Sequence, residues 1–175
     1  ELNHLRYQPM SLIDLMEFNI LGQSSVFIRK EILEQTGWLD PSFHYLLDHQ
    51  LWVRLALKAP IVYLPEILSG AHFHPQSKNV SKAGEFGKEA YRIVDWMRGI
   101  PELKTLFIQN ESKILAGAHR LNARYLLDGN QPWQAFKAYL KCLSLDFPTA
   151  MSEWYRILFS LVATLGLGKL KYLHP

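Results

Sequence analysis

A single carboxylate, Asp48, stands at the start of a predicted amphipathic helix. Leu51, Trp52 and Leu55 follow it at helical spacing and share its face. We therefore expect the carboxylate where this apolar face meets the end of the helix. There it could cap the helix by accepting hydrogen bonds from free backbone N–H groups, or it could act as a general base at the rim of a pocket. The helical pattern by itself leaves both interpretations open.

Two histidines, His72 and His74, lie two residues apart at a predicted strand. Alternate residues of a strand point to the same side, so both rings could reach one metal ion, phosphate or carboxylate. The other interpretation is a hydrogen-bonded polar pair at the end of the strand. His44 and His49 are five residues apart, a spacing that a helix does not bring onto one face, so they add no further ligand.

Other patterns typical of catalysis are missing from the sequence. Gly22 stands alone rather than in a glycine-rich phosphate loop, and there is no Gly-X-Ser-X-Gly motif and no Cys/His pair that would indicate a nucleophile. Trp38 and Trp52 could each stack on a sugar ring or belong to a hydrophobic core.

The elements that position these residues are predicted to be mixed in the first half of the chain. Strands are expected at 24–29, 61–64 and 67–73, where β-branched and aromatic residues gather. Helices are expected at 30–36, stopped by Gly37, and from about Asp48.

From about residue 81 onward the pattern is helical throughout. Residues 111–147 predict a helical hairpin broken at 128–130, and an apolar helix is expected over 149–168. The sequence therefore predicts an α+β protein that is predominantly helical, with domains at 1–80 and 81–175.

Composition narrows the class of protein. The 175 residues are 49% hydrophobic and 20% charged, which excludes a disordered chain. The net charge of +3 comes without blocks of Lys or Arg, so we expect no nucleic-acid partner. Cys142 is the only cysteine, which excludes an intramolecular disulfide and suits a reducing compartment. With no pattern of a signal peptide at the N-terminus, we expect a cytoplasmic protein.

Five segments in order make the first 80 residues resemble the second half of a family 2 glycosyltransferase catalytic domain, which has the GT-A fold. The segments are NILGQSSVFIRK (19–30), EILEQTGWLD (31–40), LDHQLWVRLA (47–56), IVYLP (61–65) and HFHPQS (72–77). The resemblance covers residues 18 to 80, somewhat under half of the chain. It implies that this region is the C-terminal portion of such a domain, on the acceptor side, and that 81–175 is a helical extension.

The resemblance implies a role for each matching position. Asp48 matches the catalytic base, and His74 matches a histidine that helps to hold the divalent metal or diphosphate. His72 is assigned to the diphosphate or the second shell of the metal. The residues assigned to acceptor binding are Gly22, Gln23, Ser24, Trp38 and His49. The chain departs from the family pattern at Leu47, where Glu is usual, and at His72, where Arg is usual.

The implied reaction is an inverting sugar transfer from a nucleotide sugar to an acceptor hydroxyl, with Mg²⁺ or Mn²⁺ as the expected cofactor. The nucleotide-binding half of such an enzyme, with its Asp-X-Asp motif, would lie upstream. We therefore expect this chain to be inactive on its own, and the donor sugar, the nucleotide and the acceptor stay open.

The C-terminal part carries the competing interpretation. Residues 154–168 are mostly apolar but shorter than the roughly twenty residues that span a bilayer. They could pack as a helix on the hairpin, or residues 154–171 could lie on the inner face of a membrane, with Lys169 and Lys171 near the headgroups. The alternative to an enzyme is a non-catalytic helical module that binds a protein or a membrane. Self-association of exposed apolar surface is a further expectation.

Overall fold

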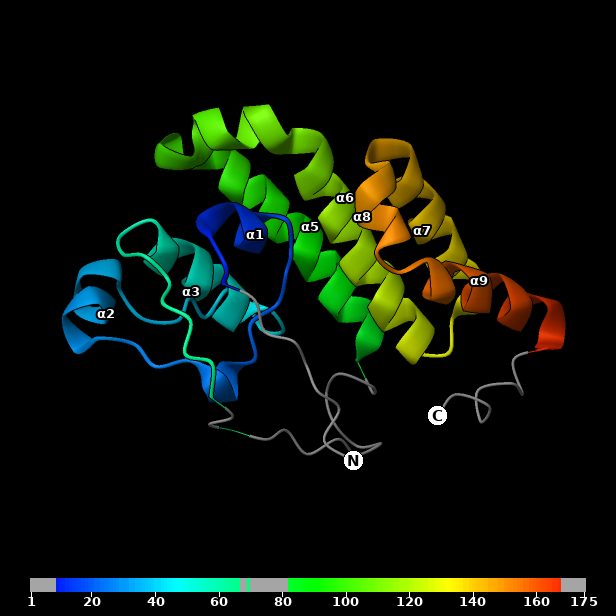
Figure 1. Ribbon diagram of the computed structural model, residues 1–175, viewed down its shortest axis with the longest axis horizontal. Helices are drawn as coiled ribbons and strands as arrows, with labels where there is room; N and C mark the ends of the chain where they lie inside the picture. Colours follow the sequence, from blue (N-terminus) through cyan, green and yellow to red (C-terminus); the bar gives the residue numbers. More distant parts are fainter. Residues whose placement is uncertain (1–8, 67–68, 70–81, 168–175) are drawn as a thin grey trace. The chain divides into compact units, whose positions relative to one another are not determined.

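The computed structural model describes residues 9–66, 69 and 82–167 (Figure 1). The chain divides into two compact units, Glu1–His72 and Phe73–Pro175. Each unit has its own buried side chains, and each is described by itself below.

The N-terminal unit is built from short helices. These are α1 (Leu12–Met16), the 3₁₀ turn η1 (Gln23–Ser25), α2 (Lys30–Thr36) and α3 (Leu47–Ala56). Helix α1 begins at a capping box, in which the Ser11 amide donates to Asp14 Oδ2 at 2.7 Å and the Asp14 amide donates to Ser11 Oγ at 3.4 Å. Leu15, Met16 and Val53 are fully buried, so α1 and α3 share the small core.

The C-terminal unit is built from longer helices. They are α5 (Ala83–Gly99), η2 (Pro101–Leu103), α6 (Lys104–Asp128), α7 (Pro132–Leu145), α8 (Phe147–Met151), α9 (Trp154–Val162) and the π-helical turn η3 (Ala163–Leu167). Helices α5, α6 and α7 lie side by side, and α8 and α9 pack on α7 (Figure 1). Ile93, Ile114 and Tyr139, one from each of the three long helices, are fully buried.

The predicted α+β fold is wrong for the part of the chain that the structure describes, which contains helices and no strand. The segment expected as a strand at 24–29 begins inside η1, and Val26 and Arg29 are extended but belong to no sheet. Residues 61–64 are irregular, and most of the third predicted strand, 67–73, lies outside the described residues. An isolated strand leaves its backbone groups unpaired, so apolar, β-branched residues alone do not make one.

Helix positions in the first half agree with the sequence pattern. Helix α2 spans Lys30–Thr36 and ends at Gly37, whose φ of 86° is one that a residue with a Cβ rarely adopts. Helix α3 starts at Leu47, within one residue of the predicted start. Both helices are set by local signals, which a single sequence carries in full.

The C-terminal helices follow the predicted breaks, with one exception. Helix α6 ends at Asp128 and α7 begins at Pro132, as the Asp-Gly-Asn turn indicates. The helix expected over 149–168 is divided into α8, α9 and η3. Asp146 sets the start of α8 by accepting from the Thr149 amide at 2.9 Å. The buried Glu153 lies between α8 and α9.

Candidate functional site

Asp48 lies in the first turn of α3 and is half-buried. The N-cap of the helix is Leu46, so the structure does not use Asp48 in the N-cap position that one sequence interpretation gave it. Its Oδ1 accepts a hydrogen bond from the His49 amide at 2.8 Å. The amino end of a helix favours a negative charge, so the position suits an ionised carboxylate that is still partly open to water.

His49 is buried and has a structural role. The side chain is 1% exposed, its Nε2 lies 2.9 Å from the Leu15 carbonyl oxygen, and its ring stacks on Phe18. Since a carbonyl can only accept, Nε2 is the protonated nitrogen. Burial lowers the pKa of His49 to about 4, although the Leu15 hydrogen bond acts the other way. His49 therefore joins α1 to α3 as a neutral ring, and its assignment to acceptor binding is not supported.

The two tryptophans separate clearly. Trp52 is 6% exposed and belongs to the core, whereas Trp38 is 72% exposed. The exposed ring sits on a turn that is held from α3, because Arg54 donates to the Trp38 carbonyl at 2.6 Å and to the Thr36 carbonyl at 3.0 Å. Trp38 is thus presented to solvent on an anchored turn and could stack on a sugar ring.

Arg54 is a positioning residue that the sequence analysis missed. Besides the two carbonyls, its Nε donates to Gln50 Oε1 one helical turn earlier, at 3.0 Å. Burial lowers the pKa of Arg54, and the nearby charge of Asp40 opposes that shift. The sequence offers little indication of this role, because Arg54 and the turn at residues 36–38 are far apart in sequence. They come into contact only in the folded chain.

The glycine segment assigned to the acceptor is an exposed turn. Gly22 is the N-cap of η1 and has an ordinary φ of −69°, so the backbone does not itself require glycine. Like Gly22, Gln23 and Ser24 are exposed, and Ser24 Oγ lies 3.4 Å from Ser69 Oγ. The structure thus brings Ser24 to Ser69 and Trp38 to α3, and the contacts it describes do not join these two turns into one cleft.

The expected metal site is not supplied by the described residues. His72 and His74 lie outside them, so their predicted roles toward a metal or diphosphate are not addressed by the structure. Within 9–66, 69 and 82–167, no group of three His, Cys, Asp or Glu side chains is arranged to hold a metal ion.

A groove in the C-terminal unit was missed entirely by sequence reasoning. It has a volume of about 750 Å³ and is lined by residues of α5, α6 and α7. Asn122 donates to the Tyr91 hydroxyl at 3.1 Å, and that hydroxyl lies 2.7 Å from His119 Nδ1. Burial lowers the pKa of His119, with the Lys141 charge as a second cause, and burial raises the pKa of Tyr91. The Tyr91 hydroxyl thus joins Asn122 and His119 in one polar chain.

The rim of this groove is basic. Lys88, Lys137 and Lys141 line it together with Glu85, which pairs with Lys88 at 2.7 Å. The lining of the groove thus combines the hydrogen-bonding groups of Tyr91, His119 and Asn122 with the positive charges of its lysines. The spacing of residues in the sequence did not predict this groove. Tyr91 lies on α5 and His119 and Asn122 lie on α6, so these three residues meet only when the two helices pack together.

Comparisons with known proteins add no family to this geometry. No protein-family model, no curated protein and no solved structure matches the chain.

Proposed function

We propose that the chain is part of an inverting glycosyltransferase that uses a nucleotide sugar, and that Asp48 is its general base. The proposal depends on the different roles of the residues in the segment 47–56, which forms α3. Leu51 and Trp52 are buried in the core, and Arg54 anchors the turn of Trp38. Asp48 lies half-buried in the first turn of the same helix, where the amino end of the helix favours a negative charge.

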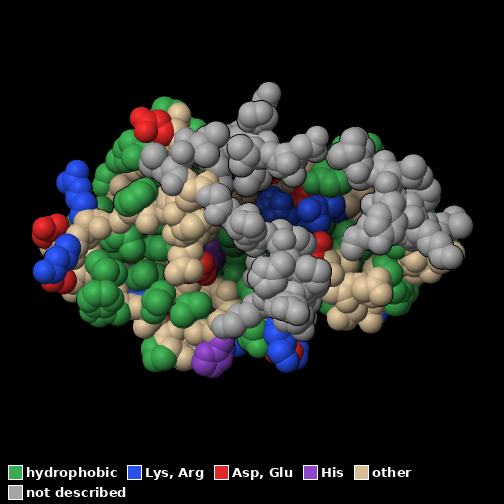
Figure 2. Space-filling model, turned by 90° about the horizontal axis from the view of Figure 1, so that it is seen from below, with side chains coloured by type: hydrophobic (Ala, Val, Ile, Leu, Met, Phe, Trp, Pro, Cys, Tyr) green, Lys and Arg blue, Asp and Glu red, His purple; other side chains and the backbone are tan. Residues whose placement is uncertain are grey.

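The surface of the N-terminal unit supports a second part of the proposal, that the donor-binding half of the enzyme lies outside these 175 residues. Phe27 and Val62 are each 76% exposed, and Leu64 is also exposed. Figure 2 shows hydrophobic side chains gathered over this unit. Soluble proteins rarely leave large apolar side chains clustered in water, so this surface fits contact with a further part of a catalytic domain.

In the proposed reaction, a carboxylate oxygen of Asp48 takes the proton of the acceptor hydroxyl as its oxygen attacks the anomeric carbon. The bond from that carbon to the nucleoside diphosphate breaks, and the diphosphate leaves with the bonding electrons. Attack from the opposite face inverts the anomeric configuration. Trp38 would stack on the sugar of the acceptor and fix its orientation. The single cysteine fits our placement of the enzyme in the cytoplasm.

The test is an Asp48→Asn variant, made in this chain and in the same chain extended upstream along its natural polypeptide. We expect the extended wild-type protein to bind UDP, GDP or dTDP with Mn²⁺ by calorimetry and to transfer sugar from the matching donor. The variant should lose transfer by about a thousandfold or more while its nucleotide affinity stays within about twofold, since only the base is removed.

Glu31→Gln is the matched control, because Glu31 is also a carboxylate in the first turn of a helix of this unit. It should keep full activity. Near wild-type turnover by Asp48→Asn would return Asp48 to a purely structural role. Absence of nucleotide binding by both the chain and its extended form would contradict the donor-site proposal and favour the non-catalytic binding module.

A further inference from the structure

Helix α9 faces the protein with its polar side, the reverse of an ordinary surface helix. Glu153, directly before the helix, is 4% exposed, and Ser160 is fully buried. Between them, Ile157 is the apolar residue that packs on the hydrophobic clusters of α6 and α7. The inward side of α9 therefore combines the apolar contacts of Ile157 with polar contacts at the start of the helix.

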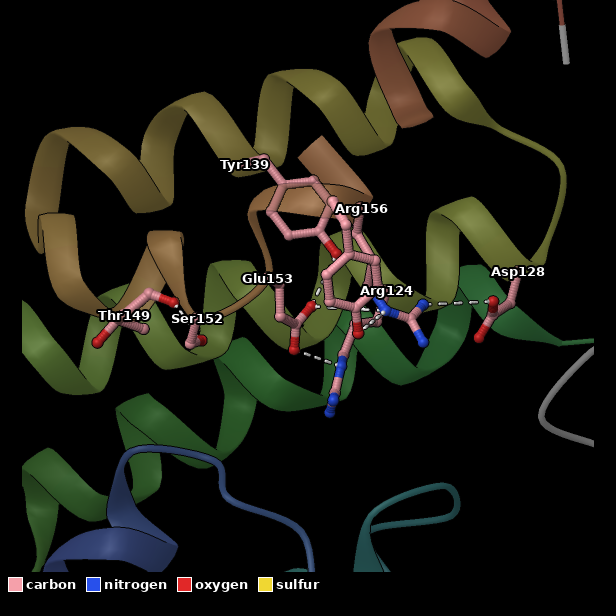
Figure 3. Close-up of polar contacts among 8 residues, drawn as sticks. Arg124, Asp128, Tyr139, Thr149, Ser152, Glu153 and Arg156 are labelled. Carbon is pink, nitrogen blue, oxygen red and sulfur yellow. Dashed lines mark hydrogen bonds and ion pairs between the residues drawn. The ribbon is translucent and has the colours of Figure 1, made fainter. Parts of the chain in front are cut away.

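These polar contacts form a network that fixes how α9 is turned (Figure 3). The Tyr139 hydroxyl of α7 donates to Glu153 Oε2 at 2.9 Å, and Arg124 Nε of α6 lies 2.6 Å from Glu153 Oε1. Arg156 of α9 reaches Asp128 at 3.8 Å. A buried carboxylate without these partners would be costly, so the network holds the start of α9 in one orientation.

The outward side is an apolar stripe, defined here as Trp154, Tyr155, Leu158, Leu161 and Leu165. All five are exposed, from 38% for Leu161 to 69% for Leu165. They recur at one- to four-residue intervals, as one face of a helix does. Removing these side chains from water would be favourable through the hydrophobic effect.

We infer that the apolar stripe binds an anionic lipid surface, with α9 lying in the plane of the headgroups. No Asp or Glu occurs from Trp154 to the end of the sequence, and Lys169 and Lys171 follow the stripe. Trp and Tyr at one end combine a polar edge with an apolar ring, the combination favoured at the headgroup boundary. An anionic lipid surface can therefore contact the apolar stripe through its acyl chains and the two lysines through its headgroups.

The geometry favours lipid over a protein partner. The apolar stripe is five side chains, fewer than the roughly 20–30 residues that each partner of a stable protein complex contributes. The absence of any acidic side chain from Trp154 onward, together with Lys169 and Lys171, suits a continuous anionic surface such as a layer of lipid headgroups. None of the helices among the described residues combines the length and the apolar character that a membrane span needs.

The test is flotation with vesicles of phosphatidylcholine, with and without phosphatidylglycerol. We expect binding to the mixed vesicles and at least about tenfold weaker binding to phosphatidylcholine alone. Leu158→Asp combined with Leu161→Asp should reduce binding to the mixed vesicles by about tenfold or more, because the charges would enter the acyl region. Circular dichroism of the same variant should keep the helical signal, since both side chains point away from the core.

Ile108→Asp is the matched control, because Ile108 is 64% exposed on α6 of the same unit but outside the apolar stripe. It should bind mixed vesicles as the wild type does. Equal losses in the control and the stripe variant, or equal binding to both kinds of vesicle, would overturn the inference. So would self-association without lipid that the stripe variant abolishes, because a second copy would then be the occupant. None of these outcomes depends on sugar transfer.

Discussion

The two units of this chain bury their apolar residues in different ways. In the C-terminal unit, long helices bring Ile93, Phe107 and Ile114 fully or almost fully out of water. In the N-terminal unit, no described helix exceeds 10 residues, and large apolar side chains such as Phe27 and Val62 stay 76% exposed. The comparison teaches that the long helices of the C-terminal unit enclose a core while the apolar stripe of α9 stays exposed, whereas the N-terminal unit exposes apolar side chains of its irregular segments, such as Phe27 and Val62.

The sharpest way to break this comparison is to truncate one phenylalanine in each unit. Phe107→Ala should destabilise the C-terminal unit by about 4 kcal/mol, because Phe107 is 2% exposed and its loss leaves a cavity. Phe27→Ala should change stability by less than about 0.5 kcal/mol, because that ring gains little from folding. Hydrogen exchange followed by mass spectrometry reports the two units separately.

The outcome that would break the comparison is a similar loss of protection for both variants. That result would mean that the ring of Phe27 is covered in solution. If the loss of protection caused by Phe27→Ala increased with protein concentration, self-association would be what buries the ring.

The fold could be predicted where it depends on neighbours in sequence. The ends of α2 at Gly37 and of α6 at Asp128 follow from glycine and turn residues. The strands could not be predicted correctly, because a strand exists only when a second segment pairs with it. Val26 and Phe27 have the right residue types and Val26 an extended backbone, but no partner strand in the part of the chain described.

The candidate site was predictable to the same extent. The sequence pattern predicted Asp48 at the start of a helix, and Asp48 lies in the first turn of α3. The burial of His49 was not predictable, because it depends on α1, more than thirty residues away in sequence. Arg54 and the Tyr91 groove were missed for the same reason, since their partners lie on other elements.

A second, smaller effect should follow from the buried carboxylate of the C-terminal unit. Glu153→Ala should destabilise this unit by about 3 kcal/mol, because Arg124 and the Tyr139 hydroxyl would lose their shared acceptor inside the protein. Urea unfolding with hydrogen exchange of α7 and α9 measures the loss.

Glu85→Ala is the control for this prediction, since Glu85 also pairs with a cation, Lys88, but both side chains are largely exposed. Its effect should stay below about 1 kcal/mol. Equal effects of the two variants would show that the network around Glu153 does not fix α9, and would remove the reason for the outward turn of the apolar stripe.

The smallest predicted effect is a difference between the two units in how their stability depends on pH. Burial lowers the pKa of His49 from 6.5 to about 4. The ring therefore becomes protonated below about pH 6.5 in the unfolded state, but only below about pH 4 in the native state. The stability that the neutral ring gives is therefore present above pH 6.5 and is lost as the pH falls, by about 2 kcal/mol between pH 7 and pH 5.

Amide exchange in α3, corrected for the intrinsic effect of pH, should report this loss. In the C-terminal unit His119 is only partly buried, so the change in α6 should have the same sign and be smaller. His49→Gln removes the titrating ring and should flatten the pH dependence of α3 alone. If α3 in this variant still lost protection between pH 7 and pH 5, another group would govern the acid response, and the link that His49 makes between α1 and α3 would not be the pH-sensitive point of the N-terminal unit.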